Sequence, residues 1–185
     1  MFWLLQASQI VIQIDGAARG NPGPAAAGIV IQDDAQGRTV RIGRYLGLRT
    51  NNQAEYEALV IALQEVARRL QPGFSGGITV RTDSQLLCRQ MTGHYRTRNP
   101  ELARLALKAH ALMARLPKVE LRHVSRTENR AADRLANLAL NRHSRMQRAA
   151  AGGELALRRD AGSQNPSTDY TDYTEENKGT ADSRR

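Results

Sequence analysis

Four carboxylates stand out as residues that could do chemistry. Each lies at the end of an apolar run or near the start of a helical pattern: Asp15, Glu55, Asp83 and Asp133. Three of them also have an ordinary structural interpretation, with Asp15 as a turn residue, Asp83 as a helix N-cap and Asp133 as a solvated side chain opposite an apolar stripe. Taken one at a time, these residues favour the structural interpretation.

Glu55 fits a purely structural role less well. At helical spacing it shares one face with three apolar residues, Leu59, Ala62 and Val66. A carboxylate on a core-facing stripe is costly unless it is paired, hydrogen-bonded or bound to a cation. Carboxylates that converge at a sheet edge repel one another, and a hard divalent cation such as Mg²⁺ removes that repulsion. The pattern therefore indicates a metal site.

The segments around these carboxylates resemble the four signature blocks of the type 1 ribonuclease H family. The blocks occur in the family's order and spacing, and the resemblance covers about residues 8 to 142. A single block would be weak support, but four together are highly specific. They are Asp15-Gly16-Ala17-Ala18-Arg19-Gly20-Asn21-Pro22-Gly23-Pro24, Thr50-Asn51-Asn52-Gln53-Ala54-Glu55, Thr82-Asp83-Ser84-Gln85 and Asn129-Arg130-Ala131-Ala132-Asp133-Arg134-Leu135-Ala136.

This resemblance implies an α/β fold with a five-stranded mixed sheet, the first three strands antiparallel, and helices on both faces. It also implies an endonuclease that cuts the RNA strand of RNA/DNA hybrids and leaves 5′-phosphate and 3′-hydroxyl ends. The four carboxylates would hold two Mg²⁺ or Mn²⁺ ions, with Asp15 bridging them. Two such ions can activate the attacking water and stabilise the leaving 3′ oxygen.

The resemblance also assigns residues to substrate binding. Amide side chains both donate and accept hydrogen bonds, as contact with a 2′-hydroxyl requires, and four of them match minor-groove positions: Asn21, Asn51, Asn52 and Gln85. Thr50 and Asn99 match a pocket for a DNA-strand phosphate. The alternatives are local, because Asn21 suits a turn, Asn51 and Asn52 lie beside a helix cap, and Asn99-Pro100 is an ordinary helix start.

Two features depart from the bacterial pattern. Many bacterial members carry a Trp- and Lys-rich protrusion after the second helix, whereas only Gly93–Arg98 intervenes here, so hybrid affinity is expected to be lower or to come from arginines elsewhere. The mobile histidine that assists product or metal release has two candidates, His123 and Arg126. His123 has the family spacing to Asp133, yet it alternates in phase with apolar strand residues, which also fits an inward-facing structural histidine.

The elements expected to position these residues alternate between strand and helix patterns. Three strands joined by short turns come first, over about 10–16, 27–32 and 38–46. The sequence Thr50-Asn51-Asn52-Gln53 predicts a capping box that opens a helix to about Leu70. A strand over 77–82, helices over 84–91 and 100–116, a strand over 118–124 and a helix over 128–145 complete a mixed sheet.

Charge and composition limit the function classes. The chain has 185 residues with 27 basic and 18 acidic side chains, and residues 149–185 hold five of the basic and seven of the acidic ones. A strongly basic body therefore precedes a slightly acidic tail, which favours a polyanion as partner. Residues 1–148 are expected to form the catalytic domain, and residues 149–185 a disordered polar tail with few apolar residues.

The remaining features indicate a cytoplasmic protein that acts alone. Cys88 is the single cysteine, so an internal disulfide and a multi-cysteine zinc site are excluded, as suits a reducing compartment. No apolar run approaches the length of a membrane span, and Phe2–Leu5 is too short for a signal-peptide core. We expect a monomer with no obligate protein partner and no membrane association.

Two other functions compete with a ribonuclease. A catalytically silent hybrid-binding module would keep the fold and the basic surface but lose a carboxylate, and here all four are present. A nuclease of the same superfold that acts on DNA junctions would not need the amides at Asn51, Asn52 and Gln85. The sequence therefore favours the metal-dependent ribonuclease.

Overall fold

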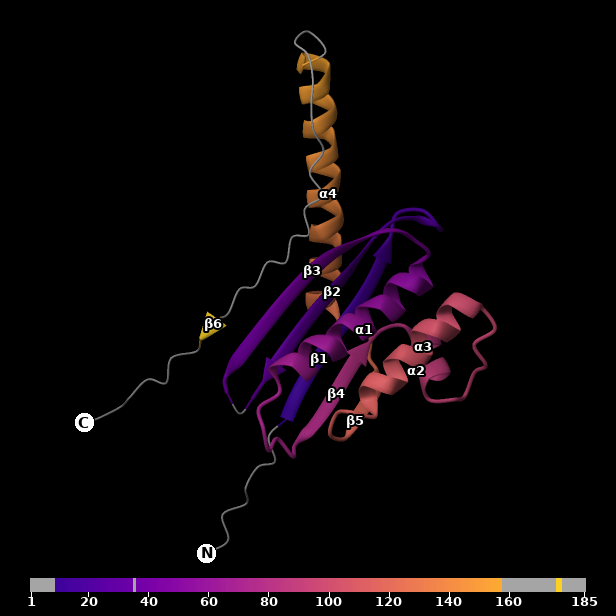
Figure 1. The fold of residues 1–185 in the computed structure, drawn as a ribbon, viewed down its shortest axis with the longest axis vertical. Helices are drawn as coiled ribbons and strands as arrows, with labels where there is room; N and C mark the ends of the chain where they lie inside the picture. The colour runs from indigo at the N-terminus through magenta and orange to yellow at the C-terminus, as the bar shows by residue number, and fades with distance from the viewer. Residues whose placement is uncertain (1–8, 35, 158–175, 178–185) are drawn as a thin grey trace, which may run out of the picture.

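A twisted mixed sheet forms the centre of the molecule, which a computed structural model describes over residues 9–34, 36–157 and 176–177 (Figure 1). The strand order is β5-β4-β1-β2-β3-β6. The strands are β1 (Gln9–Ala18), β2 (Gly23–Asp33), β3 (Arg38–Arg49), β4 (Gly77–Thr82), β5 (Val119–His123) and β6 (Glu176–Asn177). The helices are α1 (Asn51–Arg69), α2 (Gln85–Met91), α3 (Pro100–Met113) and α4 (Arg130–Leu157).

The strand directions confirm the predicted five-stranded mixed sheet. β1, β2 and β3 form an antiparallel meander, β4 runs parallel to β1, and β5 runs parallel to β4. The parallel pairs require crossovers, which α1, α2 and α3 supply. The two-residue β6 was not anticipated, and it pairs antiparallel with Arg38 and Thr39 on the outer edge of β3.

Helices cover both faces of the sheet. α1 packs on β1 and β2 with α3 beside it, and α4 crosses the opposite face over β2, β1 and β3 (Figure 1). The core between α1 and the sheet is aliphatic and fully enclosed, with Ile12, Ile14 and Ile42 from the strands meeting Leu59 and Leu63 from α1. Its burial supplies the main driving force for folding and fixes α1 against β1.

The start of α1 forms the capping box that the sequence predicts. The Thr50 hydroxyl accepts a hydrogen bond from the backbone N–H of Gln53, and the Gln53 side-chain oxygen accepts from the backbone N–H of Thr50. Both bonds satisfy donors that a helix N-terminus leaves open. The first residues of α1 are thereby held in one position beside the end of β3.

The first hairpin is longer than predicted. β1 continues past Asp15 to Ala18, and β2 begins already at Gly23. Small side chains allow this extension, because Ala17 pairs with Ala26 and Ala18 pairs with Ala25 in an unbroken ladder. The interpretation of Asp15 as a turn residue is therefore wrong, since Asp15 lies within a strand opposite Gly28.

The last helix is also longer than predicted. α4 runs to Leu157, twelve residues past the predicted end at Arg145 and beyond the predicted tail boundary at residue 149. Its extension includes three consecutive alanines and the segment Glu154–Leu157, both rich in strong helix formers, which outweigh the glycine pair between them. The predicted disorder of residues 158–175 and 178–185 lies outside the described residues.

Two further expectations concern the membrane and the cysteine. Among the described residues, none of the helices has the length and apolar character needed to cross a bilayer. Cys88 is a free, buried thiol in α2, as expected for a lone cysteine, and burial raises its pKa.

Candidate metal and nucleic-acid site

Three of the four predicted carboxylates converge at the carboxyl end of β1. Asp15 on β1, Glu55 on α1 and Asp83 directly after β4 each offer an oxygen atom, and these oxygens lie within 4.8 Å of one another. Asp15 and Glu55 are buried, with 6% of each residue exposed, and Asp83 is half-buried. Residues separated by up to 68 positions in the sequence therefore share one cluster.

Gly16 explains how Glu55 reaches the cluster. A Cβ atom at this position would lie 2.1 Å from the backbone nitrogen of Glu55 and 2.3 Å from the carbonyl carbon of Ala54. The backbone of α1 therefore touches the backbone of β1, which only glycine permits. This contact brings the Glu55 carboxylate beside Asp15 although the two residues belong to different layers.

Gly28 plays the same role for the fourth carboxylate, on the other face of the sheet. Gly28 pairs with Asp15 across β1 and β2, and a Cβ there would lie 2.0 Å from the carbonyl oxygen of Ala132. The first turn of α4 therefore rests directly on the strand pair that carries Asp15. Asp133 in that turn is partly exposed and lies near enough to raise the pKa of Asp15.

Asn129 hydrogen-bonds to two of the segments that carry the cluster, although the sequence analysis does not name it as a site residue. Its side chain is completely buried, and its Nδ2 donates to the carbonyl oxygen of Ile14 at 2.9 Å and to Oδ1 of Asp83 at 2.7 Å. One amide thus joins β1, the end of β4 and the start of α4. A residue just before a helix is ordinarily interpreted as its N-cap, and only the tertiary contacts reveal this second role.

The sequence also misassigned one helix cap. The N-cap of α2 is Ser84, whose hydroxyl accepts from the backbone N–H of Leu87, so the interpretation of Asp83 as the cap is wrong. The buried Thr82 hydroxyl accepts from the backbone N–H of Ser84 and holds this turn. The Asp83 carboxylate is left to face the cluster and to accept from Asn129.

Electrostatic repulsion makes the cluster costly without a cation. Burial and the neighbouring charges of Asp83 and Asp133 raise the pKa of Asp15 to about 7 against an opposing effect of Arg126. Burial, with Asp15 and Asp83 nearby, raises the pKa of Glu55 well above its usual range. Both raised pKa values mean that ionising all the carboxylates of the cluster at once destabilises the folded protein.

The donor set fits a hard divalent cation. Glu55 Oε2 is buried without a hydrogen-bond partner, which is an expensive arrangement for a carboxylate oxygen. The converging groups are all carboxylates, the ligands that Mg²⁺ and Mn²⁺ prefer. Asp15, Glu55 and Asp83, with Asp133 at the open side, are the residues that could hold such ions.

The four predicted amides lie at the surface around this end of the sheet. Asn51 and Asn52 occupy the exposed first turn of α1, Gln85 begins α2, and Asn21 lies in the turn between β1 and β2. The Asn21 side-chain oxygen accepts from the backbone N–H of Asn51 at 3.1 Å, so the turn is fastened to the helix start. The amides come from three separate segments.

Thr50 and Asn99 both act as helix caps. The Asn99 side chain accepts from the backbone N–H groups of Glu101 and Leu102, which confirms the alternative interpretation of Asn99-Pro100 as a helix start. A short contact between the Gln53 amide and the Glu101 carboxylate joins the first turns of α1 and α3. The N-termini of two helices, which favour anions, therefore lie next to each other.

The two candidates for the assisting residue near Asp133 lie in different surroundings. His123 ends β5 and is exposed, so the interpretation as an inward-facing structural histidine is wrong. An Arg126 guanidinium nitrogen lies 3.4 Å from Oδ1 of Asp133, and the Arg126 charge lowers the pKa of Asp15. Arg126 therefore interacts directly with the cluster.

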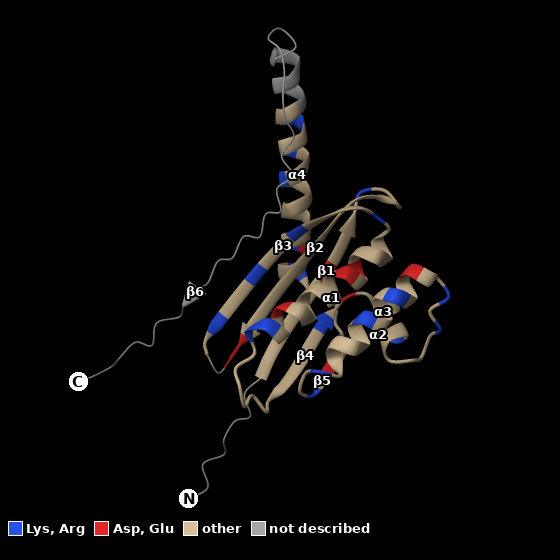
Figure 2. Cartoon of the chain, viewed as in Figure 1, with Lys and Arg blue, Asp and Glu red and all other residues tan. Residues whose placement is uncertain are grey.

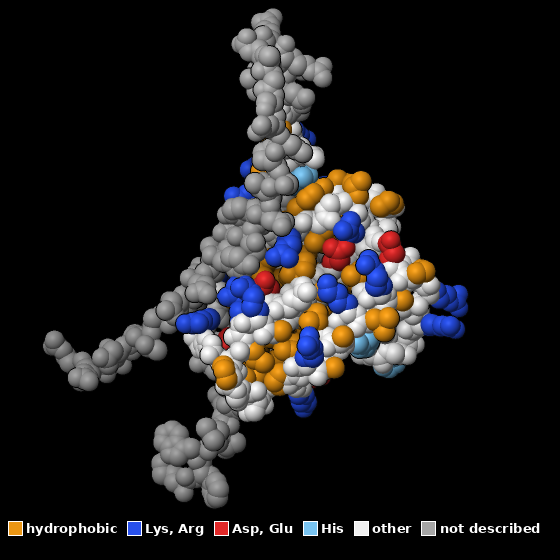
Figure 3. Space-filling model, in the orientation of Figure 1, with side chains coloured by type: hydrophobic (Ala, Val, Ile, Leu, Met, Phe, Trp, Pro, Cys, Tyr) orange, Lys and Arg blue, Asp and Glu red, His pale blue; other side chains and the backbone are white. Residues whose placement is uncertain are grey.

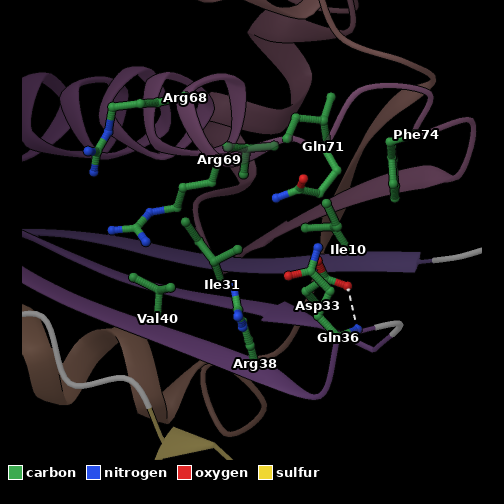
Figure 4. A pocket seen from close by; sticks show the side chains of 12 residues that line it. Ile10, Ile31, Asp33, Gln36, Arg38, Val40, Arg68, Arg69, Gln71 and Phe74 are labelled. Carbon is green, nitrogen blue, oxygen red and sulfur yellow. Dashed lines mark hydrogen bonds between the residues drawn. The ribbon is translucent and has the colours of Figure 1, made fainter.

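A separate hollow lies at the opposite end of the sheet (Figure 4). It has a volume of about 260 Å³, an apolar floor that includes Ile10, Ile31 and Phe74, and a rim that includes Arg38 and Asp33. Asp33 accepts a hydrogen bond from the backbone N–H of Gln36. Since the rim includes a single carboxylate, this hollow lacks the converging acids of the cluster at β1.

Basic side chains are spread over the surface rather than gathered in one protrusion. On the face with α1 and α3, lysine and arginine side chains alternate with hydrophobic patches (Figure 3). Arg96 and Arg98 are exposed in the short segment between α2 and α3. Such a distribution favours the approach of a polyanion from several directions.

Comparison with known proteins agrees with this geometry. Residues 13–139 match a family described as reverse transcriptase-like. The chain is 44% identical over 127 residues to ribonuclease HI of Halobacterium salinarum, covering 69% of this chain and 62% of the relative. It is 32% identical over 143 residues to ribonuclease H of Methylococcus capsulatus, covering 69% of this chain and 86% of that relative.

A solved structure of similar fold contains nucleic acid. The crystal structure of LC11-RNase H1 in complex with an RNA/DNA hybrid superimposes with a TM-score of 0.68 at 38% identity, covering 72% of this chain and 98% of that chain. The chain spans less than two thirds of the length of its Halobacterium relative, as the 62% coverage states.

Proposed function

The chain belongs to the type 1 ribonuclease H family, and on this basis we propose that it is an endonuclease that hydrolyses the RNA strand of RNA/DNA hybrids. The observation that carries the proposal is the convergence of Asp15, Glu55 and Asp83 within 4.8 Å, with a buried Glu55 oxygen that lacks a partner. A binding module would not need three mutually repelling carboxylates in one place.

We propose that these carboxylates and Asp133 would hold two Mg²⁺ ions, with Mn²⁺ as a substitute. When bound, such ions activate a water molecule and stabilise the leaving 3′ oxygen, which yields 5′-phosphate and 3′-hydroxyl ends. Support comes from the raised pKa values of Asp15 and Glu55, because burial and the neighbouring carboxylates make ionisation of both groups costly and a cation would offset that cost.

The residues around the cluster hold it in place. The buried Asn129 amide donates to Asp83 and so orients its carboxylate toward Asp15. Arg126, in the loop before α4, interacts with the exposed side of Asp133. Since the Arg126 guanidinium can hydrogen-bond the Asp133 carboxylate, we propose that Arg126, rather than His123, assists turnover by holding the Asp133 side chain.

We propose that the exposed amides recognise the hybrid through the 2′-hydroxyls of its RNA strand. Asn21, Asn51, Asn52 and Gln85 surround the end of the sheet that carries the cluster, and each can donate to and accept from a 2′-hydroxyl. Thr50 and Asn99 cap neighbouring helices, where backbone N–H groups and the helix dipoles favour a DNA-strand phosphate. The proposal includes a monomer that acts in the cytoplasm, consistent with one buried, free cysteine.

A cleavage assay with three matched duplexes tests the function. RNA/DNA, RNA/RNA and DNA/DNA duplexes of one sequence, labelled at one end, are incubated with the full chain and Mg²⁺. We expect cleavage of the hybrid alone, internal cuts in its RNA strand, and loss of cleavage on chelation. Binding of the hybrid without cleavage would favour the silent module, and cleavage of DNA/DNA would favour a junction nuclease.

Two aspartate variants distinguish a loss of catalysis from a loss of folding. Asp83→Asn keeps the side-chain size and the contact with Asn129 but removes one negative ligand. It should abolish detectable cleavage while leaving the far-ultraviolet circular dichroism spectrum unchanged. Asp34→Asn changes an exposed aspartate in the β2–β3 turn and should leave cleavage at the wild-type rate.

A further inference from the structure

The distal half of α4 extends beyond the body of the molecule. Arg19, at the end of the first hairpin strand, donates to the Asn141 side chain at 2.5 Å and contacts the Ser144 hydroxyl. His143 stacks on Tyr45 of β3 at a ring-centroid distance of 3.5 Å. From Arg145 to Ala150 every residue is exposed, and the helix projects past the sheet (Figure 1).

This helix carries a stripe of arginines along one side. At 100° per residue, Arg130, Arg134, Arg145 and Arg148 project within an arc of about 60°. All four are exposed, and none of them forms an ion pair within the part of the chain that the structure describes. Figure 2 shows basic residues on successive turns of the projecting helix.

The stripe is unusual for a solvated helix. Exposed helices ordinarily intersperse acids and bases three or four residues apart, which stabilises the helix. Between Arg130 and Arg148 the single acid is Asp133, whose charge lies near enough to Asp15 to raise its pKa. Arg130 and Arg134, and Arg145 and Arg148, are like-charge neighbours, so the helix alone gains nothing from this pattern.

The position of the stripe indicates its partner. Arg130 and Arg134 flank Asp133 at the cluster, whereas Arg148 lies eighteen residues farther along the same helix, about 27 Å away at 1.5 Å per residue. The stripe therefore begins at Arg130 and Arg134, beside Asp133, and resumes eleven positions later at Arg145 and Arg148 on the projecting part of the helix. A row of guanidinium groups matches a row of phosphates in charge and in hydrogen-bond geometry.

We propose that the arginine stripe of α4 is a second contact for the substrate duplex, binding the phosphates of its backbone beyond the cleavage site. The proposal rests on the proposed function, because the duplex is taken to be bound at the cluster. It assigns to α4 phosphate contacts in addition to any made by Arg96 and Arg98, which are exposed in the short segment between α2 and α3. The contacts involve neither bases nor 2′-hydroxyls.

The test measures binding without cleavage. Fluorescence anisotropy of a labelled RNA/DNA hybrid, in EDTA and over a series of KCl concentrations, compares the full chain with R145A/R148A. Each lost phosphate contact lowers the slope of log K against log salt by about 0.9, so we expect a decrease of about 1.8 and a rise in Kd of roughly fivefold at low salt. A DNA/DNA duplex of the same sequence should show the same decrease.

Two control variants separate the stripe from net charge. R115A/K118A removes the same charge from exposed residues between α3 and β5 and should leave the slope near that of the wild type. R145Q/Q147R keeps the composition but moves one charge about 200° around the helix, and should lower the slope by about 0.9. Equal effects from R145A/R148A and R115A/K118A would overturn the proposal.

Three further outcomes of the binding and cleavage measurements would each decide one of the two proposals. An unchanged slope in R145A/R148A overturns the proposal, and so does a change in Tm without a change in Kd, which would assign the arginines to contacts within the chain. Failure of the wild type to cleave any hybrid would refute the proposed function, whereas the salt slope in EDTA would still report on the stripe.

Discussion

Replacing Asp15 by asparagine should make the metal-free protein more stable, not less. Asparagine is close in size and keeps a polar group within the cluster, but it carries no negative charge. In the folded protein the pKa of Asp15 is raised from 3.8 to about 7, chiefly by burial and by the charge of Asp83. The ionised form of Asp15 therefore opposes folding.

The sign follows from proton linkage. Between pH 3.8 and 7 the unfolded chain has already lost the Asp15 proton while the folded protein retains it, so stability falls as pH rises through this window. Above pH 7 the cost is fully present and amounts to about 4 kcal/mol at 1.36 kcal/mol per pH unit. Below pH 4 it vanishes. Asp15→Asn should therefore gain about 2 to 4 kcal/mol at pH 8 and almost nothing at pH 4.

Thermal unfolding in EDTA at three pH values measures this effect. For a chain of this size, a gain of 2 to 4 kcal/mol raises Tm by roughly 5 to 12 °C at pH 8. Added Mg²⁺ should stabilise the wild type, by about 2.7 kcal/mol at a hundredfold excess over Kd, and stabilise the variant much less. Asp34→Asn, at an exposed turn position, should change Tm little at any pH.

One result would refute this reasoning. If Asp15→Asn melts well below the wild type at pH 8 without metal, Asp15 stabilises the fold through its hydrogen bonds, and the cluster is not held under repulsion. Cleavage of the hybrid by Asp15→Asn at the wild-type rate would exclude Asp15 as a metal ligand.

Four further predictions follow from the contacts around the cluster. Asn129→Ala should lower stability by about 2 to 3 kcal/mol in urea unfolding and reduce cleavage, because it leaves the buried Ile14 carbonyl unpaired. In single-turnover cleavage, Asp83→Asn should be severe and Asp133→Asn the mildest, since Asp133 is partly exposed and lies outside the three converging carboxylates. Gly16→Ala should lower Tm and cleavage together, because its Cβ would meet the α1 backbone at 2.1 Å. Ending the chain after Leu157 should leave Tm and hybrid cleavage near wild type, since the removed residues contain few apolar side chains.

Local patterns in the sequence predicted most of the elements. The capping box at Thr50 is present as expected, because its two hydrogen bonds join residues three positions apart. The strand over 77–82 is also present, because its alternating buried residues are a local pattern. The errors concern ends of elements that depend on partners elsewhere. β1 continues beyond Gly16 because small residues of β2 pair with it, and no single-strand pattern contains that information.

In the candidate site, the sequence predicts residues by type and spacing but not the contacts between distant segments. The four carboxylates were identified by type and spacing, and Glu55 by its position on an apolar helical face. The role of Asn129 was missed because its partners, Ile14 and Asp83, are 115 and 46 residues away in the sequence. The alternation of His123 with Val119 and Leu121 predicts an inward-facing side chain, but His123 is exposed, because alternation along a strand does not reveal what covers each residue.

The sequence by itself determined which residues are available for chemistry and which elements carry them, since side-chain type and periodicity are local properties. Only the tertiary structure decided that these residues meet. Two backbone contacts are responsible: Gly16 lets α1 touch β1, and Gly28 lets α4 touch β2, which brings Glu55 and Asp133 to Asp15 from opposite faces of the sheet. The physical reason is steric, because a single Cβ at either glycine would hold the layers apart and separate the charges that the site needs together.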